Sequence, residues 1–273
     1  MEEVLKKTKF DDLRAHFKPS QLPFSDDSVE QAERLLKEID FPTRKNEHWK
    51  YTSLNGLLKL PFDGELNGEV SAPQISSNAK RIIIKNGQIQ ADVSINGVKT
   101  HWDSMPKISE EDPFDALNLL HCTSAIEIVF DQENTSDIEL VFENTENNFV
   151  FPRTYIKCCK QSKGNVIMNF QGSEVNESFI NASTFIEVEE NAHLSVYKIQ
   201  KNGLNSFDLQ RAKFIEFNFF DKFIFSRFSR KSFLSIKNYY GSRKLGKQNV
   251  CRAKKCNERQ DETLFRKDFY LNF

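Results

Sequence analysis

A series of short, β-branched segments between residues 81 and 199 constrains the fold of this chain more than any other feature. The segments include RIIIK (81–85), AIEIVF (125–130), NVIMNF (165–170) and HLSVYKI (193–199), and polar turns such as EENAH separate them. Segments of this length, rich in Ile and Val and partly alternating, are typical of strands. Their number and close spacing predict a mainly β domain.

The turns between these segments narrow the architecture only partly. Asn86-Gly87, between RIIIK and QIQADVS, is predicted to form a tight hairpin turn. A sandwich, a barrel and a β-solenoid therefore all remain open on pattern alone, and no strict sequence repeat points to a solenoid. One helical segment, PFDALNLLHCT (113–123), interrupts the series.

Residues 1–60 show helical rather than strand periodicity. Ser28 and Gln31 match a capping box, and Phe41-Pro42 is a stop signal. We therefore predict a helix over DSVEQAERLLKEID with one apolar face made of Val29, Ala32, Leu35, Leu36 and Ile39. Residues 61–80 contain scattered Pro and Gly and are predicted to be a linker.

The composition changes after residue 210. Residues 211–273 contain 16 Lys and Arg against 6 Asp and Glu, a net charge of +10, while the whole chain has −1. They also hold 11 of the 25 Phe, at positions that fit neither strand nor helix periodicity. We predict a disordered, atypical basic tail here. Two interpretations stay open: an out-of-frame translation of an AT-rich gene, or a divergent basic tail.

The cysteines do not suggest a disulfide framework or a metal site. Cys158 and Cys159 are adjacent in a predicted strand, so their side chains point to opposite faces. Cys251 and Cys256 lack the second pair that a structural zinc site needs, and Cys122 stands alone. The sequence has no signal-peptide core and no apolar run of membrane-spanning length. We expect a cytoplasmic, reduced protein without a metal of its own and without a membrane partner.

Catalytic motifs are absent from the sequence. No nucleophile elbow, H-E-x-x-H motif or Gly-rich phosphate loop occurs. His121 and Cys122 are neighbours, but neighbours in sequence rarely reach the geometry of a catalytic pair; His193 is predicted to be a surface residue in a turn. We therefore expect no enzyme, and no catalytic or cofactor-binding residue. The basic tail is only a weak signal for nucleic acid, which is not an expected partner.

The stretch FPTRKNEHWKYTSL (41–54) is the densest cluster of chemistry in the chain. If a helix follows Thr43 as its N-cap, Arg44, Glu47 and Tyr51 lie near one another at spacings of three and four. Trp49 then faces elsewhere and can anchor the helix on the β region. We interpret the stretch as a structural signature, made of Pro42, Arg44, Glu47, Trp49, Lys50 and Tyr51.

This stretch resembles the N-terminal region of the SufD family, a component of the Suf iron–sulfur cluster assembly system. The family pattern there is Phe-Pro-x-Arg-x-x-Glu-x-Trp-Lys-Tyr-Thr, which Phe41 to Thr52 match. The resemblance continues in Asn86-Gly87, in the Ala-Leu-Asn helix within DALNLLH (115–121), in Pro152-Arg153 and in SFINASTFIEVEENAHLSVYKIQ with Asn181. It covers about residues 1–210 and does not extend into the tail.

The resemblance implies a fold and a role. The fold is a right-handed parallel β-helix, a solenoid, preceded by a small helical N-terminal domain. The implied domains are a helical region (1–60), a linker (61–80), an incomplete β-helix core (81–210) and the atypical tail (211–273). The implied role is a non-catalytic scaffold subunit that works with SufB and the ATPase SufC. The iron–sulfur cluster belongs to that complex, and no ligand for it is assigned to this chain.

Family members are much longer than 273 residues, and their late β-helix and SufC-binding helices would follow residue 210. We therefore expect a truncated or frameshifted copy with impaired function, whose contacts to SufB and SufC are lost with the C-terminal part. The alternative is a standalone β-solenoid binding protein whose basic tail docks an acidic partner or nucleic acid.

Overall fold

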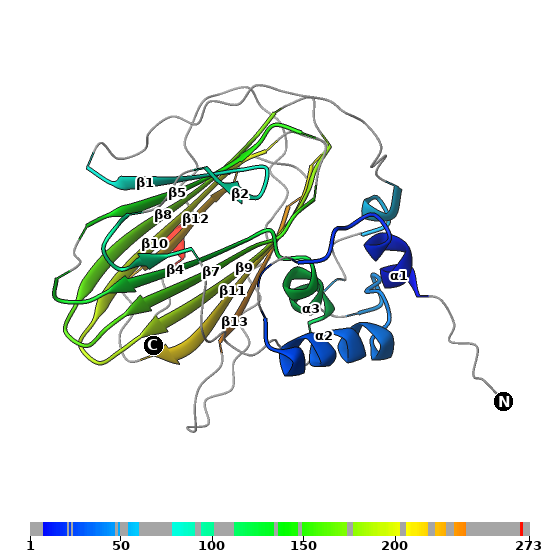
Figure 1. Cartoon of the computed structure of the whole chain (residues 1–273), viewed down its shortest axis with the longest axis horizontal. Coiled ribbons are helices and arrows are strands. Elements are labelled where there is room, and N and C mark those ends of the chain that lie inside the picture. The colour runs from blue at the N-terminus through cyan, green and yellow to red at the C-terminus, as the bar shows by residue number, and fades with distance from the viewer. Residues whose placement is uncertain are drawn as a thin grey trace.

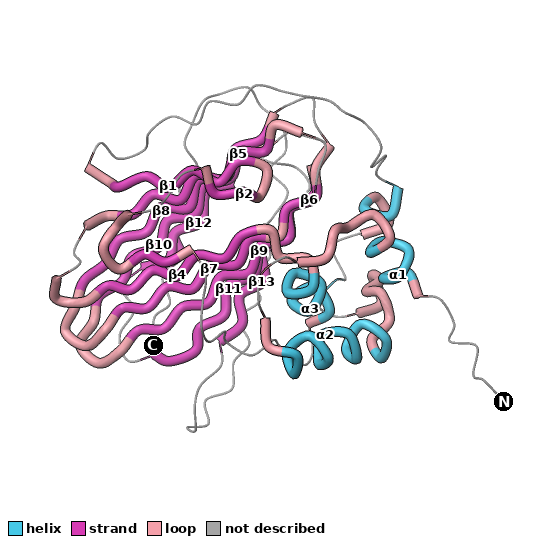
Figure 2. Tube along the Cα trace, in the orientation of Figure 1, coloured by secondary structure: helices cyan, strands magenta, loops and turns pink. Residues whose placement is uncertain are grey.

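The structure is a computed structural model of the chain. It describes residues 8–20, 22, 24–46, 49, 54–59, 78–90, 94–100, 112–133, 136–146, 149–173, 177–202, 206–217, 222–227, 232–238 and 268–269. From residue 215 onward the description covers the backbone only. Helices gather at one end of the molecule, and two sheets make up the rest (Figures 1 and 2).

The helical elements of the N-terminal region are α1 (Lys9–Arg14), α2 (Asp26–Glu38) and a short 3-10 helix (Leu57–Lys59). A capping box between Thr8 and Asp11 starts α1. The predicted apolar face of α2 is confirmed, because its five residues are buried or packed against the same core. The predicted capping box of α2 was wrong. Ser25, not Ser28, precedes the helix, and their hydroxyls bond to each other at 2.9 Å.

The strands cover most of the chain from residue 80 to residue 238. They are β1 (Lys80–Lys85), β2 (Gln88–Ile89), β3 (Val98–Lys99), β4 (Ser124–Phe130), β5 (Ile138–Asn144), β6 (Phe149–Val150), β7 (Pro152–Cys158), β8 (Lys163–Gly172), β9 (Phe179–Val188), β10 (His193–Lys201), β11 (Phe207–Phe217), β12 (Lys222–Arg227), β13 (Ser232–Asn238) and β14 (Asp268–Phe269). The third helix, α3 (Pro113–Leu120), is the predicted interruption, three residues shorter at its end.

The strands form two sheets that face each other (Figure 1). One has the order β14-β12-β10-β8-β5-β1-β2, and the other has β13-β11-β9-β7-β4-β3. From β7 to β13, consecutive strands alternate between the sheets, and neighbours within a sheet are parallel. Among the described strands, antiparallel pairs occur at the edges: β1 with β2, β3 with β4, and β12 with β14. The mainly β fold with a small helical N-terminus is confirmed; the right-handed β-helix stays a prediction.

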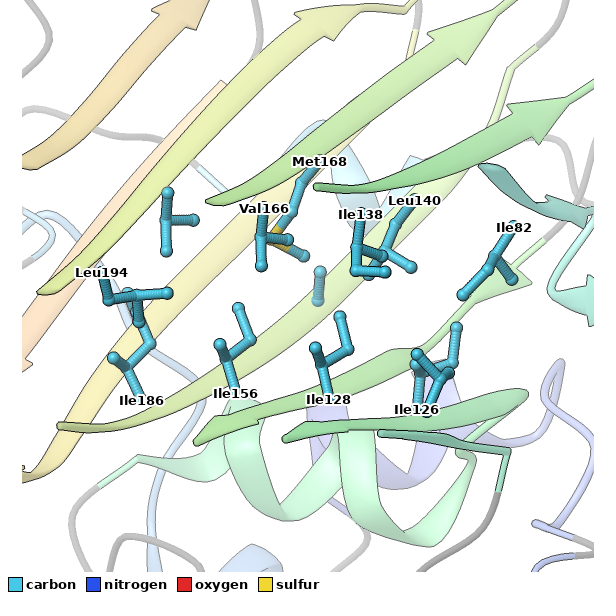
Figure 3. Packing of buried hydrophobic residues seen from close by; sticks show 14 of the residues in the cluster. Ile82, Ile126, Ile128, Ile138, Leu140, Ile156, Val166, Met168, Ile186 and Leu194 are labelled. Atoms are coloured by element: carbon cyan, nitrogen blue, oxygen red, sulfur yellow. The ribbon is translucent and has the colours of Figure 1, made fainter. Parts of the chain in front are cut away.

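A hydrophobic core separate from that of the helical region lies between the two sheets. Inward-facing residues are stacked in register from strand to strand, as in the row Ile128, Ile156 and Ile186 on β4, β7 and β9. The row Leu140 and Met168 faces it from β5 and β8 (Figure 3). Because neighbouring strands are parallel and in register, each apolar column continues along the stack, which keeps water out of the interior.

Gly164 on β8 marks a point where this core has no spare volume. A Cβ atom added there would lie 2.3 Å from the Phe130 ring, which is itself fully buried. We predict that Gly164→Ala lowers the free energy of unfolding by about 1–3 kcal/mol. A urea melt measures this. Gly97→Ala is not a suitable control, because the φ of Gly97 is +74° and Ala there would strain the backbone. An unchanged urea midpoint for Gly164→Ala would show that the Phe130 ring can shift freely.

Two turns, each of which joins a strand of one sheet to the next strand in the other sheet, repeat the same backbone conformation. Gln161, after β7, has a φ of 60°, and Asn191, after β9, has a φ of 57°. The two turns are stacked, because the Gln161 amide donates to the Glu190 carbonyl at 3.1 Å and the His193 amide donates to the Ser162 carbonyl at 2.9 Å. The predicted Asn86-Gly87 turn is also present. Both of its residues have positive φ, and it joins the antiparallel pair β1 and β2.

The predicted boundary at residue 210 falls inside a strand. β11 runs from Phe207 to Phe217 and pairs with β9 along its length, with a bulge near Phe214. β12 and β13 then extend the two sheets in parallel. Residues 222–227 and 232–238, assigned to a disordered tail, are therefore strands, and the loss of strand periodicity misled the prediction. No helix of the described part of the chain is long and apolar enough to span a membrane.

Candidate functional site

A buried polar junction forms where α3 packs on the outer face of the sheet that contains β7, β9 and β11. The carboxylate of Asp112 caps the helix by accepting from the amides of Phe114 and Asp115, at 3.1 and 3.3 Å. Pro113 occupies the first turn, where its missing N–H costs nothing. Every residue of α3 is buried, so its polar side chains need partners inside the protein.

Arg153 on β7 supplies the first set of partners. Its side chain is 0% exposed, and Nη1 lies 3.1 Å from Asp115 Oδ1 and 2.8 Å from Asn118 Oδ1. The guanidinium also stacks 4.7 Å from the centre of the Phe185 ring. The Asn118 amide in turn donates to the backbone carbonyls of Pro152 and Asn181. One arginine thus ties the helix to two strands.

Arg211 on β11 closes the junction from the other side. Its Nη2 donates to the Phe114 carbonyl at 3.0 Å and to Ser183 Oγ at 3.1 Å, and also to the Asn181 side chain. Its Nε lies 3.8 Å from Asp112, an ion-pair distance. Register explains the arrangement. Arg153, Ser183 and Arg211 are directly paired neighbours on three adjacent parallel strands, so their side chains emerge in one row.

The junction holds two arginines against two aspartates in a site closed to solvent. Such charges stay buried only when paired and hydrogen-bonded. Backbone carbonyls, the helix cap and the strand register hold these charged groups in place. The motifs that carried the sequence resemblance, DALNLLH, Pro152-Arg153 and Asn181, all meet here. Arg211, assigned to the basic tail, was missed because composition does not distinguish a buried charge from a solvated one.

A second polar group lies inside the core, between the sheets. Lys198 on β10 is fully buried, with Nζ 3.3 Å from Thr184 Oγ1 and 5.4 Å from the centre of the Phe170 ring. Burial lowers the pKa of Lys198 to about 7; the charge of Arg211 lowers it too, while Asp208 opposes the shift. Further buried polar side chains of β10, β11 and their connection include Gln200, Asn202, Asp208 and Gln210.

The described cysteines have no features of reactive or metal-binding thiols. Burial raises the pKa of Cys122 to about 12, and burial also raises the pKa of Cys158 and Cys159. The described residues contain no group of three or more His, Cys, Asp or Glu side chains placed to hold a metal ion. Cys251 and Cys256 lie outside the described residues.

The signature stretch 41–54 contacts α3. The Phe41 ring lies 5.0 Å from the Phe10 ring and 6.0 Å from the Phe114 ring, centre to centre. The Trp49 indole is half-buried and lies 5.3 Å from Phe114. Pro42 is buried and Arg44 is exposed. Glu47, Lys50 and Tyr51 lie outside the described residues, so the ion pair of Arg44 with Glu47 stays a prediction.

Trp49 is expected to contribute to stability in proportion to this partial burial. We predict that Trp49→Ala lowers the free energy of unfolding by about 2 kcal/mol, less than the roughly 3–5 kcal/mol of a fully buried Trp. A denaturant melt followed by circular dichroism measures the loss. Trp49→Phe, which keeps a ring against Phe114, should recover more than half of it. A loss near zero would mean that the indole does not anchor the stretch.

A segment that contains the central strands and part of the junction matches a known family. Residues 141–216 match the model described as "SUF system FeS cluster assembly, SufBD core domain". The match begins within β5, ends within β11 and includes Arg153, Asn181 and Arg211. This segment is a SufBD core. The match supports membership of the SufB/SufD superfamily. A comparison with curated proteins finds no match for the chain. The SufBD core extends six residues beyond the predicted boundary at 210.

Proposed function

We propose that this protein is a non-catalytic scaffold subunit of iron–sulfur cluster assembly, in a complex with SufB-like and SufC-like subunits, of the SufD type. The observation that carries the proposal is the SufBD core match over residues 141–216, whose family description names the SUF system. The description supports a part in cluster assembly. The SufD type, the two partners and the cluster held by the complex are our inference.

The geometry supports a structural role. The polar groups of the α3 junction are held by each other and by backbone carbonyls, and the described thiols are buried or have raised pKa values. A stack of strands forms a rigid body whose surface keeps a fixed shape, which suits a scaffold. The iron–sulfur cluster would be cargo of the complex, with no ligand assigned to this chain.

We also propose that the two sheets are the faces of one right-handed parallel β-helix. The alternation of consecutive strands between sheets, the parallel register and the stacked turns at Gln161 and Asn191 all favour it. In a solenoid each coil is stabilised by its neighbours. Replacing Ile156 by Asp in one coil should therefore unfold the coils on both sides together, as hydrogen exchange would show. Loss of protection confined to β7 would contradict this winding.

Co-expression tests the proposed complex. The tagged chain is produced with SufB-like and SufC-like subunits, and the assembly is isolated and its composition determined by mass photometry and native mass spectrometry. The proposal predicts a stable complex that contains all three chains and gains an iron–sulfur chromophore on reconstitution. A chain that is folded by circular dichroism but recovers neither partner would overturn the scaffold role.

A matched pair of variants tests whether association with the partners depends on the buried junction. Arg153→Met should remove both, because it disrupts the buried junction. Arg34→Met changes an exposed ion pair with Glu38 and should preserve both. The alternative function, in which the basic tail docks an acidic partner or nucleic acid, depends on side chains outside the described residues, and no described contact supports it.

A further inference from the structure

His121 lies where the N-terminal helices meet the β body. It is the C-cap residue of α3 and is 5% exposed. Its Nε2 accepts from Arg14 Nε at 3.3 Å, and its Nδ1 lies 2.9 Å from the backbone carbonyl oxygen of Lys18. The imidazole thus bridges α1 and the segment after it to the end of α3.

Arg14 is held by a second partner in the helical region. Its Nη1 and Nη2 donate to the two carboxylate oxygens of Glu33 on α2, at 2.8 and 2.5 Å. This bidentate pairing lowers the pKa of Glu33, mainly through the hydrogen bond. The Arg14 guanidinium therefore lies between an ionised carboxylate and the imidazole of His121.

These contacts fix the protonation state of His121. A guanidinium can only donate, and a backbone carbonyl can only accept. Nε2 must therefore be the acceptor and Nδ1 must carry the proton, which is the neutral imidazole. A second proton would sit on Nε2, replace the acceptor with a donor and place a positive charge against Arg14. Arg14 cannot give up its own charge in response.

We propose that His121 is a proton-operated latch, which holds residues 9–20 on the β body when neutral and releases them when protonated. The released segment includes Phe17, whose ring packs 4.9 Å from Phe151 and 4.3 Å from Phe149. The Ser20 amide, which donates to the Leu120 carbonyl at 2.8 Å, leaves with it. Opening uncovers an aromatic surface on the β body.

The groups around the ring set the direction of the response. Arg14 faces it from α1 and Glu33 from α2, the backbone carbonyl of Lys18 faces it from the connecting segment, and the rings of Phe17 and Phe151 pack against it without charge. Burial lowers the pKa of His121 below its ordinary value of 6.5 and Arg14 lowers it further, while the Lys18 carbonyl and Glu33 oppose the shift. The unfolded or opened state therefore binds more protons below pH 6.5, so the latch is closed above that pH and weakens as the pH falls.

Hydrogen exchange of the intact chain tests the latch. Protection factors for peptides covering residues 9–20 are measured between pH 7.5 and pH 5.5 and corrected for intrinsic exchange rates. One coupled proton changes the opening equilibrium by up to about tenfold over this range. The proposal predicts a loss of protection approaching tenfold in residues 9–20, with β5 and β8 unchanged. Equal loss in all segments, or no loss in residues 9–20, would overturn it.

Variants make the assignment specific. His121→Gln offers an acceptor to Arg14 and a donor to the Lys18 carbonyl without titrating, so it should keep residues 9–20 protected at both pH values. His16→Gln and His193→Gln change exposed histidines and should leave the pH response intact. Should His121→Gln fold poorly, Arg14→Gln is a second probe. It removes the like charge and so raises the closed-state pKa of His121 towards that of the opened state, and the loss of protection between pH 7.5 and pH 5.5 should become smaller. A response that survives His121→Gln, or is unmoved by Arg14→Gln in a folded chain, would overturn the proposal.

Discussion

Replacing Arg153 by Met should lower the free energy of unfolding by about 3–5 kcal/mol, the cost of leaving a buried charge without its partner. The side chain is 0% exposed and supplies the cation for Asp115 and a donor for Asn118. After the substitution, the Asp115 carboxylate loses this cation but keeps its hydrogen bond from Ser183 Oγ at 3.0 Å. The loss should therefore come from α3 separating from the sheet, and urea melts followed by circular dichroism would measure it.

Two further variants distinguish the buried charge from simple loss of packing. Adding Asp115→Asn to Arg153→Met removes the carboxylate that has lost the Arg153 cation and should recover at least 1 kcal/mol, a coupling typical of residues in direct contact. Arg34→Met, at an ion pair with both side chains more than 60% exposed, should stay within about 0.5 kcal/mol of the parent. A loss below 1 kcal/mol for Arg153→Met would show that the junction does not hold the helix.

The strands were predictable because their signal is local. Segments such as AIEIVF and NVIMNF alternate along the chain, and each became a strand that places Ile126, Ile128 or Val166 in the core. The same holds for the helix that follows Asp112, where a capping residue, a proline and an apolar run are adjacent. Such features depend on nearest neighbours and need no knowledge of the rest of the fold.

The α3 junction was not predictable from the sequence, because its contacts are long-range. Asp115 and Arg153 are 38 positions apart, and Phe114 and Arg211 are 97 apart. Their approach depends on the register of three parallel strands, which no residue pattern specifies by itself. The sequence resemblance marked Arg153 and Asn181 as family features without showing that they touch the same helix. The structure supplies that link.

The boundary at residue 210 shows the limit of composition as evidence. The excess of Lys and Arg after that point suggested a solvated tail. Yet Arg211 and Lys213 lie in the middle of β11, where one is buried at the junction and the other lies 5.9 Å from the Phe185 ring. A bulge near Phe214 shifts the register there. An irregular strand of this kind does not show the period of two on which strand prediction depends.

Lys198 did leave a signal in the sequence, because strand parity assigns it to the interior. It follows Leu194 and Val196 at intervals of two along β10, and both of those residues are in the core. A lysine at the third inward position must either find a carboxylate or lose its charge. Among the described residues, the hydrogen bond of its ammonium group is to Thr184, a neutral hydroxyl. Burial should therefore make this lysine costly to the fold.

Lys198→Met should accordingly stabilise the protein at pH 7, by about 2–3 kcal/mol. The folded-state pKa is about 7 against an ordinary value of 10.5, so the unfolded state binds more protons between these limits and the parent gains stability as the pH rises from 7 towards 10.5. At pH 7 the full linkage cost is about 4 kcal/mol. Removing the ammonium that donates to Thr184 costs about 1–2 kcal/mol, which reduces the expected gain in stability. Met fills the volume beside Phe170.

The pH dependence of the stability difference shows whether burial of the Lys198 amine causes the stabilisation. Urea melts at pH 7 and pH 9.5 should show that the parent gains stability relative to Lys198→Met as the pH rises, so that the difference between them shrinks by more than half. Lys201→Met, at the exposed end of the same strand, should have the same difference in free energy of unfolding from the parent at both pH values. Destabilisation by Lys198→Met, with a constant difference between the two pH values, would mean that Lys198 is charged and paired in the folded protein. In that case the interior of the SufBD core would tolerate a cation without cost to its stability.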